Sequence, residues 1–125
     1  MNYDIYHMKN MSSQSVINAL SNATRFRSIL LLLEREELCV CEINDVIDEA
    51  QPNISRNLGH LKESGLVTDR REGRWIYYRI NPDLPDWAMQ ILLSCKAGSN
   101  GHEPFESDLA KLSSMACNVD KKCCA

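Results

Sequence analysis

The chain has 125 residues, of which 25% are charged and six are cysteines, and its net charge at pH 7 is −3. This length is typical of one domain with a modest core. The longest apolar stretch, residues 29–33, is far too short to span a membrane. No basic region followed by an apolar run opens the chain, so we expect no secretion signal and a cytoplasmic protein. Six cysteines in a cytoplasmic protein indicate metal or redox chemistry rather than a disulfide scaffold.

The first half of the chain has the apolar periodicity of four helices. Residues 1–11 are polar and show no period, which predicts a flexible N-terminal arm. Helices are predicted over residues 13–20, over 23 to about 35, over about 41–48, and from 51 to the glycine at position 65. An asparagine is the predicted N-cap of the second helix. A proline in the first turn begins the fourth helix, and the glycine ends it.

After this glycine the period changes from helical to twofold. Residues 66–71 and 74–80 read as two strands of a hairpin. A fifth helix is predicted over about 85–95, followed by a loop at 97–104 and a short amphipathic segment at 107–116. The predicted organisation is a flexible arm (1–11), a folded domain (12–95), and a C-terminal extension with a cysteine-rich tail (96–125).

Charge is unevenly distributed along the chain. Residues 34–49 contain seven acidic residues and one basic residue, whereas residues 51–80 contain six basic and three acidic residues. A local basic surface is what contact with phosphates requires, whatever the net charge. The acidic segment could favour a cation near its two cysteines, although a solvated helix face explains most of its side chains more simply.

The third and fourth helices, with the hairpin, have the order of a winged helix-turn-helix, a mostly α fold with a small β-hairpin. Its second helix would enter the major groove of DNA. Arginine can pair with guanine, and asparagine or glutamine with adenine, whereas arginines at a hairpin tip suit phosphates or a minor groove. The predicted DNA-binding residues are the outward-facing Gln51, Asn53, Ser55, Arg56, Asn57 and His60 of the helix, and Arg70, Arg71 and Arg74 of the hairpin.

Two cysteines one residue apart, Cys39 and Cys41, precede this module. Side chains at positions i and i+2 point the same way only in an extended backbone, and on a helix they do not face each other. One ion bonded to both sulfurs therefore needs a backbone that is non-helical or becomes so. Thiolates favour thiophilic ions over magnesium or calcium. On spacing alone, two small buried hydrophobic residues explain the pair equally well.

About half of the chain, from residue 16 to 81, resembles the ArsR/SmtB family of bacterial metal-responsive repressors, in particular its arsenical-sensing branch. The matching segments are LSNATRFR (20–27), ELCVCE (37–42), QPNISRNL (51–58), GLV (65–67) and DRREGRWIYYR (69–79). The resemblance implies a homodimer that binds operator DNA when metal-free and leaves it when an inducer binds. It implies no organic cofactor, no membrane partner and no enzymatic activity.

The resemblance also implies that the first and fifth helices build the dimer contact. The residues expected there are Val16, Leu20, Trp87, Ile91 and Leu92. On the first helix we expect Val16, Ile17 and Leu20 to face inward. Two separated apolar stripes in so short a chain fit a dimer better than the core of a monomer.

The arsenical-sensing branch binds trivalent arsenic or antimony through three thiols at the start of the third helix. Two of them match Cys39 and Cys41, but the third position holds Asn44, and an amide is a poor ligand for a thiophilic ion. The site then has two protein thiols, or a small-molecule thiol, a hydroxide or another cysteine completes it. The candidate cysteines are Cys117, Cys123, Cys124 and Cys95. Bonding both sulfurs should unwind the first turn of the third helix and move it against the DNA-reading helix.

Other members of this family and other classes fit less well. The cadmium- and lead-sensing branch shares the Cys-Val-Cys string but also uses cysteines in its N-terminal arm, and residues 1–38 contain none. The zinc-sensing branch uses Asp and His on the fifth helix, and residues 82–95 contain no histidine. Sensing of cadmium or lead and switching by thiol oxidation stay open as alternatives. An enzyme is disfavoured, because no catalytic cysteine loop or phosphate-cradling glycine pattern appears.

Overall fold

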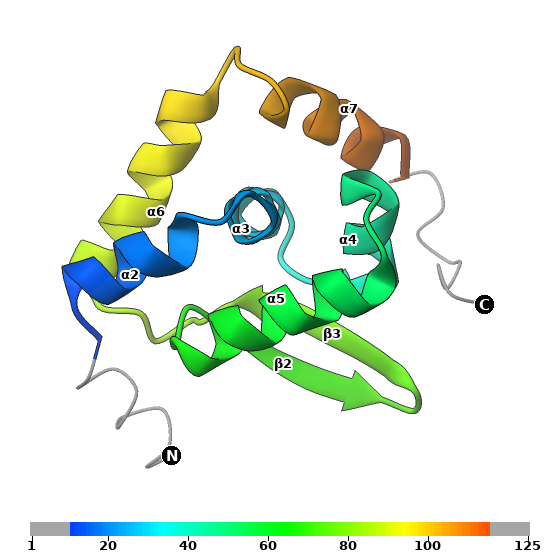
Figure 1. The fold of residues 1–125 in the computed structure, drawn as a ribbon, viewed down its shortest axis with the longest axis horizontal. Helices are drawn as coiled ribbons and strands as arrows, with labels where there is room; N and C mark the ends of the chain where they lie inside the picture. The colour runs from blue at the N-terminus through cyan, green and yellow to red at the C-terminus, as the bar shows by residue number, and fades with distance from the viewer. Residues whose placement is uncertain (1–10, 116–125) are drawn as a thin grey trace.

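The computed structural model describes residues 11–115, in which a small sheet lies at the lower edge of a group of helices (Figure 1). The predicted tail cysteines, and all of the predicted arm except Met11, lie outside the described residues. The elements are α2 (Ser13–Leu20), α3 (Ala23–Glu34), β1 (Leu38–Cys39), α4 (Val40–Ile47), α5 (Gln51–Glu63), β2 (Val67–Glu72), β3 (Trp75–Ile80), α6 (Asp86–Ser99) and α7 (Phe105–Met115). None of the described helices is long and apolar enough to cross a membrane.

Local signals in the sequence explain where the first helices begin. Ser12 caps α2 by accepting a hydrogen bond from the backbone N–H of Ser15, at 3.1 Å. Asn22 caps α3, as predicted, by accepting from the N–H of Arg25 at 3.0 Å. Each cap satisfies a backbone donor that the helix itself leaves without a partner. Gly65 follows α5 with a φ of 87°, a left-handed conformation that glycine adopts without a steric penalty.

Three antiparallel strands form a sheet in the order β1-β3-β2. The predicted hairpin is confirmed, and the pairing of Glu72 with Trp75 leaves Gly73 and Arg74 as its two-residue loop. Gly73 has a φ of 63°, as a glycine at the first central position of a tight hairpin turn requires. The strand β1 was not predicted, because two residues are too few to show a twofold period. Its Cys39 pairs with Tyr77, which ties the predicted ligand segment to the hairpin.

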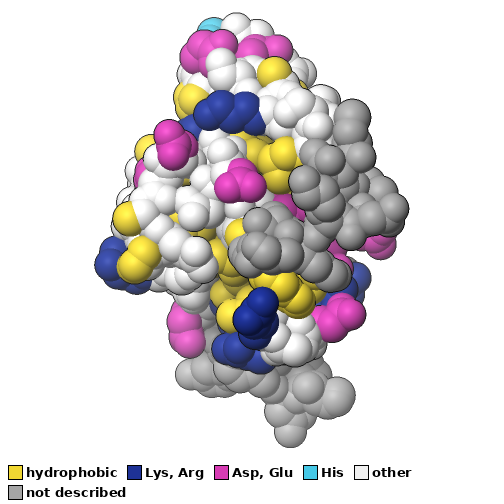
Figure 2. Space-filling view, turned by 90° about the vertical axis from the view of Figure 1, so that its right-hand side faces the viewer, with side chains coloured by type: hydrophobic (Ala, Val, Ile, Leu, Met, Phe, Trp, Pro, Cys, Tyr) yellow, Lys and Arg dark blue, Asp and Glu magenta, His cyan; other side chains and the backbone are white. Residues whose placement is uncertain are grey.

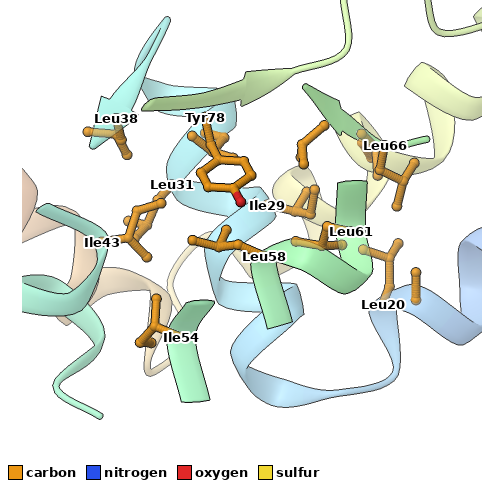
Figure 3. Close-up of a cluster of buried hydrophobic side chains, with 14 of the residues drawn as sticks. Leu20, Ile29, Leu31, Leu38, Ile43, Ile54, Leu58, Leu61, Leu66 and Tyr78 are labelled. Carbon is orange, nitrogen blue, oxygen red and sulfur yellow. The ribbon is translucent and has the colours of Figure 1, made fainter. Parts of the chain in front are cut away.

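The core lies around α3, which Figure 1 shows end-on in the middle of the other elements. Ile29 and Leu31 of α3 are fully buried, and Leu58 of α5 and Tyr78 of β3 point toward them (Figure 3). Fully burying one such aliphatic side chain contributes about 1.5–3 kcal/mol. The apolar side of α5 is therefore held against α3 and the sheet, which leaves its other side exposed.

The C-terminal part of the described chain differs from the predicted boundaries. Helix α6 continues to Ser99 rather than ending near residue 95, and α7 begins at Phe105, whose side chain is buried. Helix α7 packs on α3 and α4, with Asp108 ion-paired to Arg27 at 2.9 Å. The described part of the predicted extension thus packs against the helix that carries Cys41.

Candidate DNA-binding surface and cysteine pair

The turn between α4 and α5 is held by polar contacts that set the orientation of α5. Asp48 ends α4 with a φ of 61°, in the left-handed conformation. The side-chain amide of Asn44 donates to the backbone carbonyl of Glu49. The Glu49 carboxylate in turn accepts from the Thr24 hydroxyl at 2.8 Å and from the Asn53 amide. One carboxylate therefore joins the start of α3, the turn and the start of α5.

Helix α5 presents most of its predicted DNA-binding side chains to solvent. Four predicted residues are exposed and Asn53 is half-buried; the exposed ones are Gln51, Ser55, Arg56 and His60. The first turn of α5 also has Pro52, and its N-terminal end carries the partial positive charge of the helix dipole. This side of α5 offers amide, hydroxyl and guanidinium groups for hydrogen bonds to base edges and phosphates.

Asn57 is the exception, and its predicted outward orientation is wrong. Its side chain is buried, with the residue 7% exposed. Its Oδ1 accepts from Arg25 Nη1 at 2.9 Å, and its Nδ2 donates to the Asn53 carbonyl at 3.0 Å. Asn57 lies three residues after the buried Ile54 and one before the buried Leu58, so helical periodicity places it at the edge of the core-facing side. Because Asn57 is polar, the sequence pattern assigned it to the exposed side of the helix.

The three hairpin arginines are exposed but have different surroundings. Arg70 binds Glu37 through two hydrogen bonds, at 2.7 and 2.8 Å, and Glu72 through one at 2.8 Å. The bonds to Glu37 and then to Glu72 raise the pKa of Arg70. Its charge is already matched by two carboxylates. Arg74 instead lies over the ring of Trp75, 5.2 Å from the centroid.

The cysteine pair sits where the chain changes from strand to helix. Cys39 is the N-cap of α4, with extended φ and ψ of −74° and 150°, and Cys41 is in the first turn. The two sulfurs lie 3.0 Å apart, and both residues are buried. Because Cys39 is extended, the sulfurs converge without any unwinding of α4. The condition of a non-helical backbone at the pair is met at Cys39, so unwinding of α4 is not needed to bring the two sulfurs together.

This sulfur separation is close to what one shared ion requires. Two sulfurs at about 2.3 Å from one ion, with a bond angle of roughly 90–110°, lie about 3.3–3.8 Å apart. The observed pair, at 3.0 Å, needs to widen by about 0.3–0.8 Å. The Glu42 carboxylate accepts from the Cys39 N–H at 2.8 Å and holds the turn in this shape.

The described residues supply no third ligand to this pair. Within residues 11–115 no group of three or more His, Cys, Asp or Glu side chains is placed to hold a metal ion, so Cys95 does not join Cys39 and Cys41. Burial raises the pKa of the Cys95 thiol, which favours the protonated form. The other candidates, Cys117, Cys123 and Cys124, lie outside the described residues.

A cavity that the sequence did not predict opens beside Cys39. Its volume is about 350 Å³. It lies between the start of α5 and the hairpin, and its lining residues are Cys39, Val40, Gln51, Ser55, Arg74, Trp75 and Ile76. Figure 2 faces the side of the molecule with α4 and the hairpin tip, where apolar side chains gather in the lower half beside Lys and Arg side chains.

The predicted dimer residues differ in exposure: some are buried and others lie at the surface. Val16, Leu20 and Leu92 are buried in the core of the protomer itself, so their assignment to an interface surface is wrong. Trp87 is 41% exposed and Ile91 is half-buried. Ile17, which was expected to face inward, is 52% exposed.

The exposed apolar side chains lie on two helices at the same side of the molecule. Figure 1 shows α2, which carries Ile17, and α6, which carries Trp87, on that side. Leu93 of α6 is also exposed, at 43%, and was missed. Its exposure could not be read from the sequence, because the apolar residues of α6 extend around more than one side of the helix.

Comparison with known proteins places this arrangement in a family. Residues 24–69 match the family model described as "Bacterial regulatory protein, arsR family". The chain is 40% identical over 103 residues to the arsenical resistance operon repressor of Escherichia coli K12, covering 82% of this chain and 86% of the relative. It is 47% identical over 77 residues to the arsenic resistance transcriptional regulator ArsR2 of Pseudomonas putida KT2440, covering 62% of this chain and 67% of the relative.

A solved structure agrees with these sequence matches. The transcriptional repressor BigR from Xylella fastidiosa superposes with a TM-score of 0.60 at 29% identity, covering 78% of this chain and 94% of that chain. Family, fold and exposed α5 side chains point to the same kind of protein. The chain belongs to the ArsR family of bacterial regulatory proteins, and it is a DNA-binding transcriptional regulator with a winged helix-turn-helix, not an enzyme.

Proposed function

We propose that this protein is an arsenite- and antimonite-responsive transcriptional repressor of the cytoplasm. It binds operator DNA as a homodimer and leaves the operator when the metalloid bonds to Cys39 and Cys41. The observation that carries the proposal is the 3.0 Å separation of the two sulfurs at the N-terminus of α4. Two relatives that share at least 40% identity with the chain are named for arsenic resistance, which supports a metalloid rather than a hard cation.

The binding chemistry needs no electron transfer. Arsenite at neutral pH is As(OH)₃, and each thiol that bonds to arsenic releases one water. Two cysteines therefore give two sulfur–arsenic bonds and two waters, with one hydroxyl left on arsenic. The two thiol protons go into these waters.

Operator binding is assigned to the exposed side of α5 and to the hairpin tip. The residues proposed to contact DNA are Gln51, Asn53, Ser55, Arg56, His60, Arg71 and Arg74. Arg70 would first have to exchange Glu37 and Glu72 for phosphates, so we expect a smaller contribution from it. Asn57 is buried and is assigned a structural role instead.

The link between the two sites runs through short segments. Cys39 belongs to β1, which pairs with the hairpin strand β3, while Cys41 belongs to α4, which packs on α5. Widening the sulfur pair moves the start of α4 relative to the hairpin. A coupling of about 1–3 kcal/mol, or about 5- to 150-fold in operator affinity, is typical of such linked sites.

The homodimer is assigned to the side formed by α2 and α6. Ile17, Trp87 and Leu93 expose apolar side chains there, and Ile91 is half-buried. Large exposed apolar side chains on neighbouring helices are typical of an interface. A twofold dimer would present two copies of α5 to two half-sites on DNA.

The test is an arsenite titration of the operator-bound protein, followed by fluorescence anisotropy of labelled DNA. The double variant Cys39→Ser, Cys41→Ser should bind the operator normally and should not be released by arsenite. Cys95→Ser is the matched control and should be released like the wild type. Unchanged release from the double variant would refute the assignment of these ligands.

The short sulfur contact also favours a second candidate, switching by oxidation. A disulfide would bring the two sulfurs to about 2.05 Å from each other, a shift of about 1 Å in the opposite direction. Release by hydrogen peroxide but not by arsenite would support this candidate. Release by cadmium or lead but not by arsenite would instead support a repressor of another soft metal.

A further inference from the structure

Glu49 is an acidic side chain at the start of the helix that is proposed to contact DNA. It lies in the turn between α4 and α5 and is half-buried. A carboxylate at this place repels the phosphates of the operator. The donors that it binds are neutral groups, namely the Thr24 hydroxyl, 2.8 Å from both carboxylate oxygens, and the Asn53 amide. These contacts orient neighbouring side chains rather than match a positive charge.

Asn53 extends this orientation outward to Arg56. Its Nδ2 donates to the Glu49 carboxylate, so its Oδ1 is directed away from Glu49. This Oδ1 accepts from Arg56 Nη1 at 3.0 Å and makes a longer contact of 3.4 Å with Asn57 Nδ2. An ionised carboxylate only accepts hydrogen bonds, and a guanidinium only donates them. A flipped Asn53 amide would therefore lose both contacts, which leaves it one orientation.

Arg56 keeps its charge while one edge of its guanidinium is held. It is exposed, and in residues 11–115 it takes part in no salt bridge. Arg70, by contrast, binds two carboxylates. The bond to Asn53 uses one of the five N–H donors of the Arg56 guanidinium. Other donors are left for O6 and N7 of a guanine, the two acceptors that arginine pairs with in the major groove.

We infer that Glu49 is a positioning residue for DNA reading, which acts through Asn53 so that Arg56 pairs with a guanine of the operator. The inference rests on the proposed function, because it uses the same side of α5, and it gives Asn53 a positioning role in place of a direct contact with a base. A guanidinium that is held before binding loses less conformational freedom when it pairs with the base. Attraction to phosphates does not need a fixed guanidinium, so loss of Glu49 weakens the recognition of guanine more than general affinity for DNA.

The experiment measures operator affinity by fluorescence anisotropy, with each guanine of the operator replaced in turn by 7-deazaguanine, which lacks the N7 acceptor. The quantity of interest is the ratio of the dissociation constants for modified and unmodified DNA within one variant, because that ratio cancels changes in general affinity. In the wild type, one position in each half-site should give a ratio of about ten, the cost of one charge-assisted hydrogen bond. Arg56→Ala should abolish the effect at that position.

Two variants test the positioning step. Glu49→Ala should reduce the ratio to about three, because Arg56 still reaches the base but must be ordered on binding. Asn53→Ala should do the same while it keeps the contact of Glu49 with Thr24, so it tests the inference even if Glu49→Ala does not fold.

Two controls separate positioning from charge and from stability. Glu49→Gln keeps an acceptor oxygen for Thr24 and Asn53 and should retain the wild-type ratio. Asp45→Ala removes an exposed acid of the same acidic segment, so it matches Glu49→Ala in charge and should also retain the ratio. A role of Glu49 in stability alone would weaken binding to modified and unmodified DNA equally.

An unchanged ratio in both Glu49→Ala and Asn53→Ala would overturn the inference, and so would loss of the ratio in Glu49→Gln. A wild type that no 7-deazaguanine weakens would overturn it as well, because Arg56 would then contact no guanine. Each of these results leaves the proposed function in place. Failure of the wild type to bind the operator, or to leave it when arsenite is added, would instead overturn the proposed function.

Discussion

Two single alanine variants at adjacent positions of α5, Asn57→Ala and Arg56→Ala, should have different effects: the first should lower stability and the second should lower DNA binding. Asn57 is 7% exposed and bridges Arg25 and the Asn53 carbonyl, whereas Arg56 is exposed and hydrogen bonds to the Asn53 side chain at 3.0 Å. We expect Asn57→Ala to lower the free energy of unfolding, and Arg56→Ala to lower operator affinity with little effect on unfolding.

The magnitude for Asn57→Ala follows from the two shorter of the three hydrogen bonds that it removes, since the third, to Asn53 Oδ1, is long at 3.4 Å. The bond from the Arg25 guanidinium is charge-assisted, which is typically about 1.5–3 kcal/mol, and the neutral bond to the carbonyl is about 0.5–1.5 kcal/mol. Arg25 is half-buried and keeps its bond to the Ala19 carbonyl at 2.7 Å, so water offsets part of the loss. The expected destabilisation is about 2 kcal/mol, equivalent to a Tm lowered by roughly 8 °C.

Urea unfolding and operator titration measure these two effects independently. Arg56→Ala should change the free energy of unfolding by less than about 0.5 kcal/mol. It should cost about 1–3 kcal/mol in operator affinity if it loses a base contact. Asn57 would instead face DNA if Asn57→Ala were as stable as the wild type and lost operator affinity as Arg56→Ala does. The assignment of α5 sides would then be refuted.

Three further predictions concern two buried ionisable groups and one half-buried one. Asp108→Ala should destabilise the protein by about 2–3 kcal/mol in urea unfolding, because it removes the partner of Arg27, whose side chain stays 21% exposed and is partly rehydrated; a cost below about 0.5 kcal/mol would contradict the role of this pair in docking α7. In a variant with the other five cysteines replaced by serine, Cys95 should react with iodoacetamide with a pH midpoint above the ordinary thiol value of 9.0, because burial raises its pKa. A midpoint below 9.0 would exclude a desolvated Cys95 thiol. Burial also raises the pKa of Tyr78 above 10.0, so its contribution to stability is complete below pH 10 and is lost as the pH rises toward the folded-state pKa; Tyr78→Phe should flatten this alkaline decrease in thermal unfolding scans, and an identical decrease in both proteins would assign it to other groups.

Much of the local structure could be predicted because its causes are local. The cap at Asn22, the proline in the first turn of α5 and the glycines at positions 65 and 73 act through neighbouring backbone groups. These signals, with the apolar periodicity, predicted the order of the helices and the hairpin. The same order, combined with the Cys-Val-Cys string, was enough to indicate the family that the comparisons then showed.

The side of a helix on which a residue lies depended on distant partners. Asn57 is a plausible base contact by type, and only Arg25, 32 positions earlier in the chain, gives its amide a buried role. Ile17 is apolar but exposed, because the core space under α2 is filled by Val16, Ala19 and Leu20. Residue type alone therefore assigned both positions to the wrong environment.

By itself, the sequence determined the helix order, the cysteine pair and the basic hairpin, because composition, spacing and caps are properties of short segments. The tertiary structure alone decided the geometry of the cysteine pair. Pairing of Cys39 with Tyr77 of the distant strand β3 holds the backbone extended at the start of α4, and the two sulfurs meet at 3.0 Å. It also decided the open cavity beside Cys39, since that space forms only when the start of α5 and the hairpin lie side by side. Both features arise from contacts between segments far apart in the chain, which spacing along one segment cannot encode.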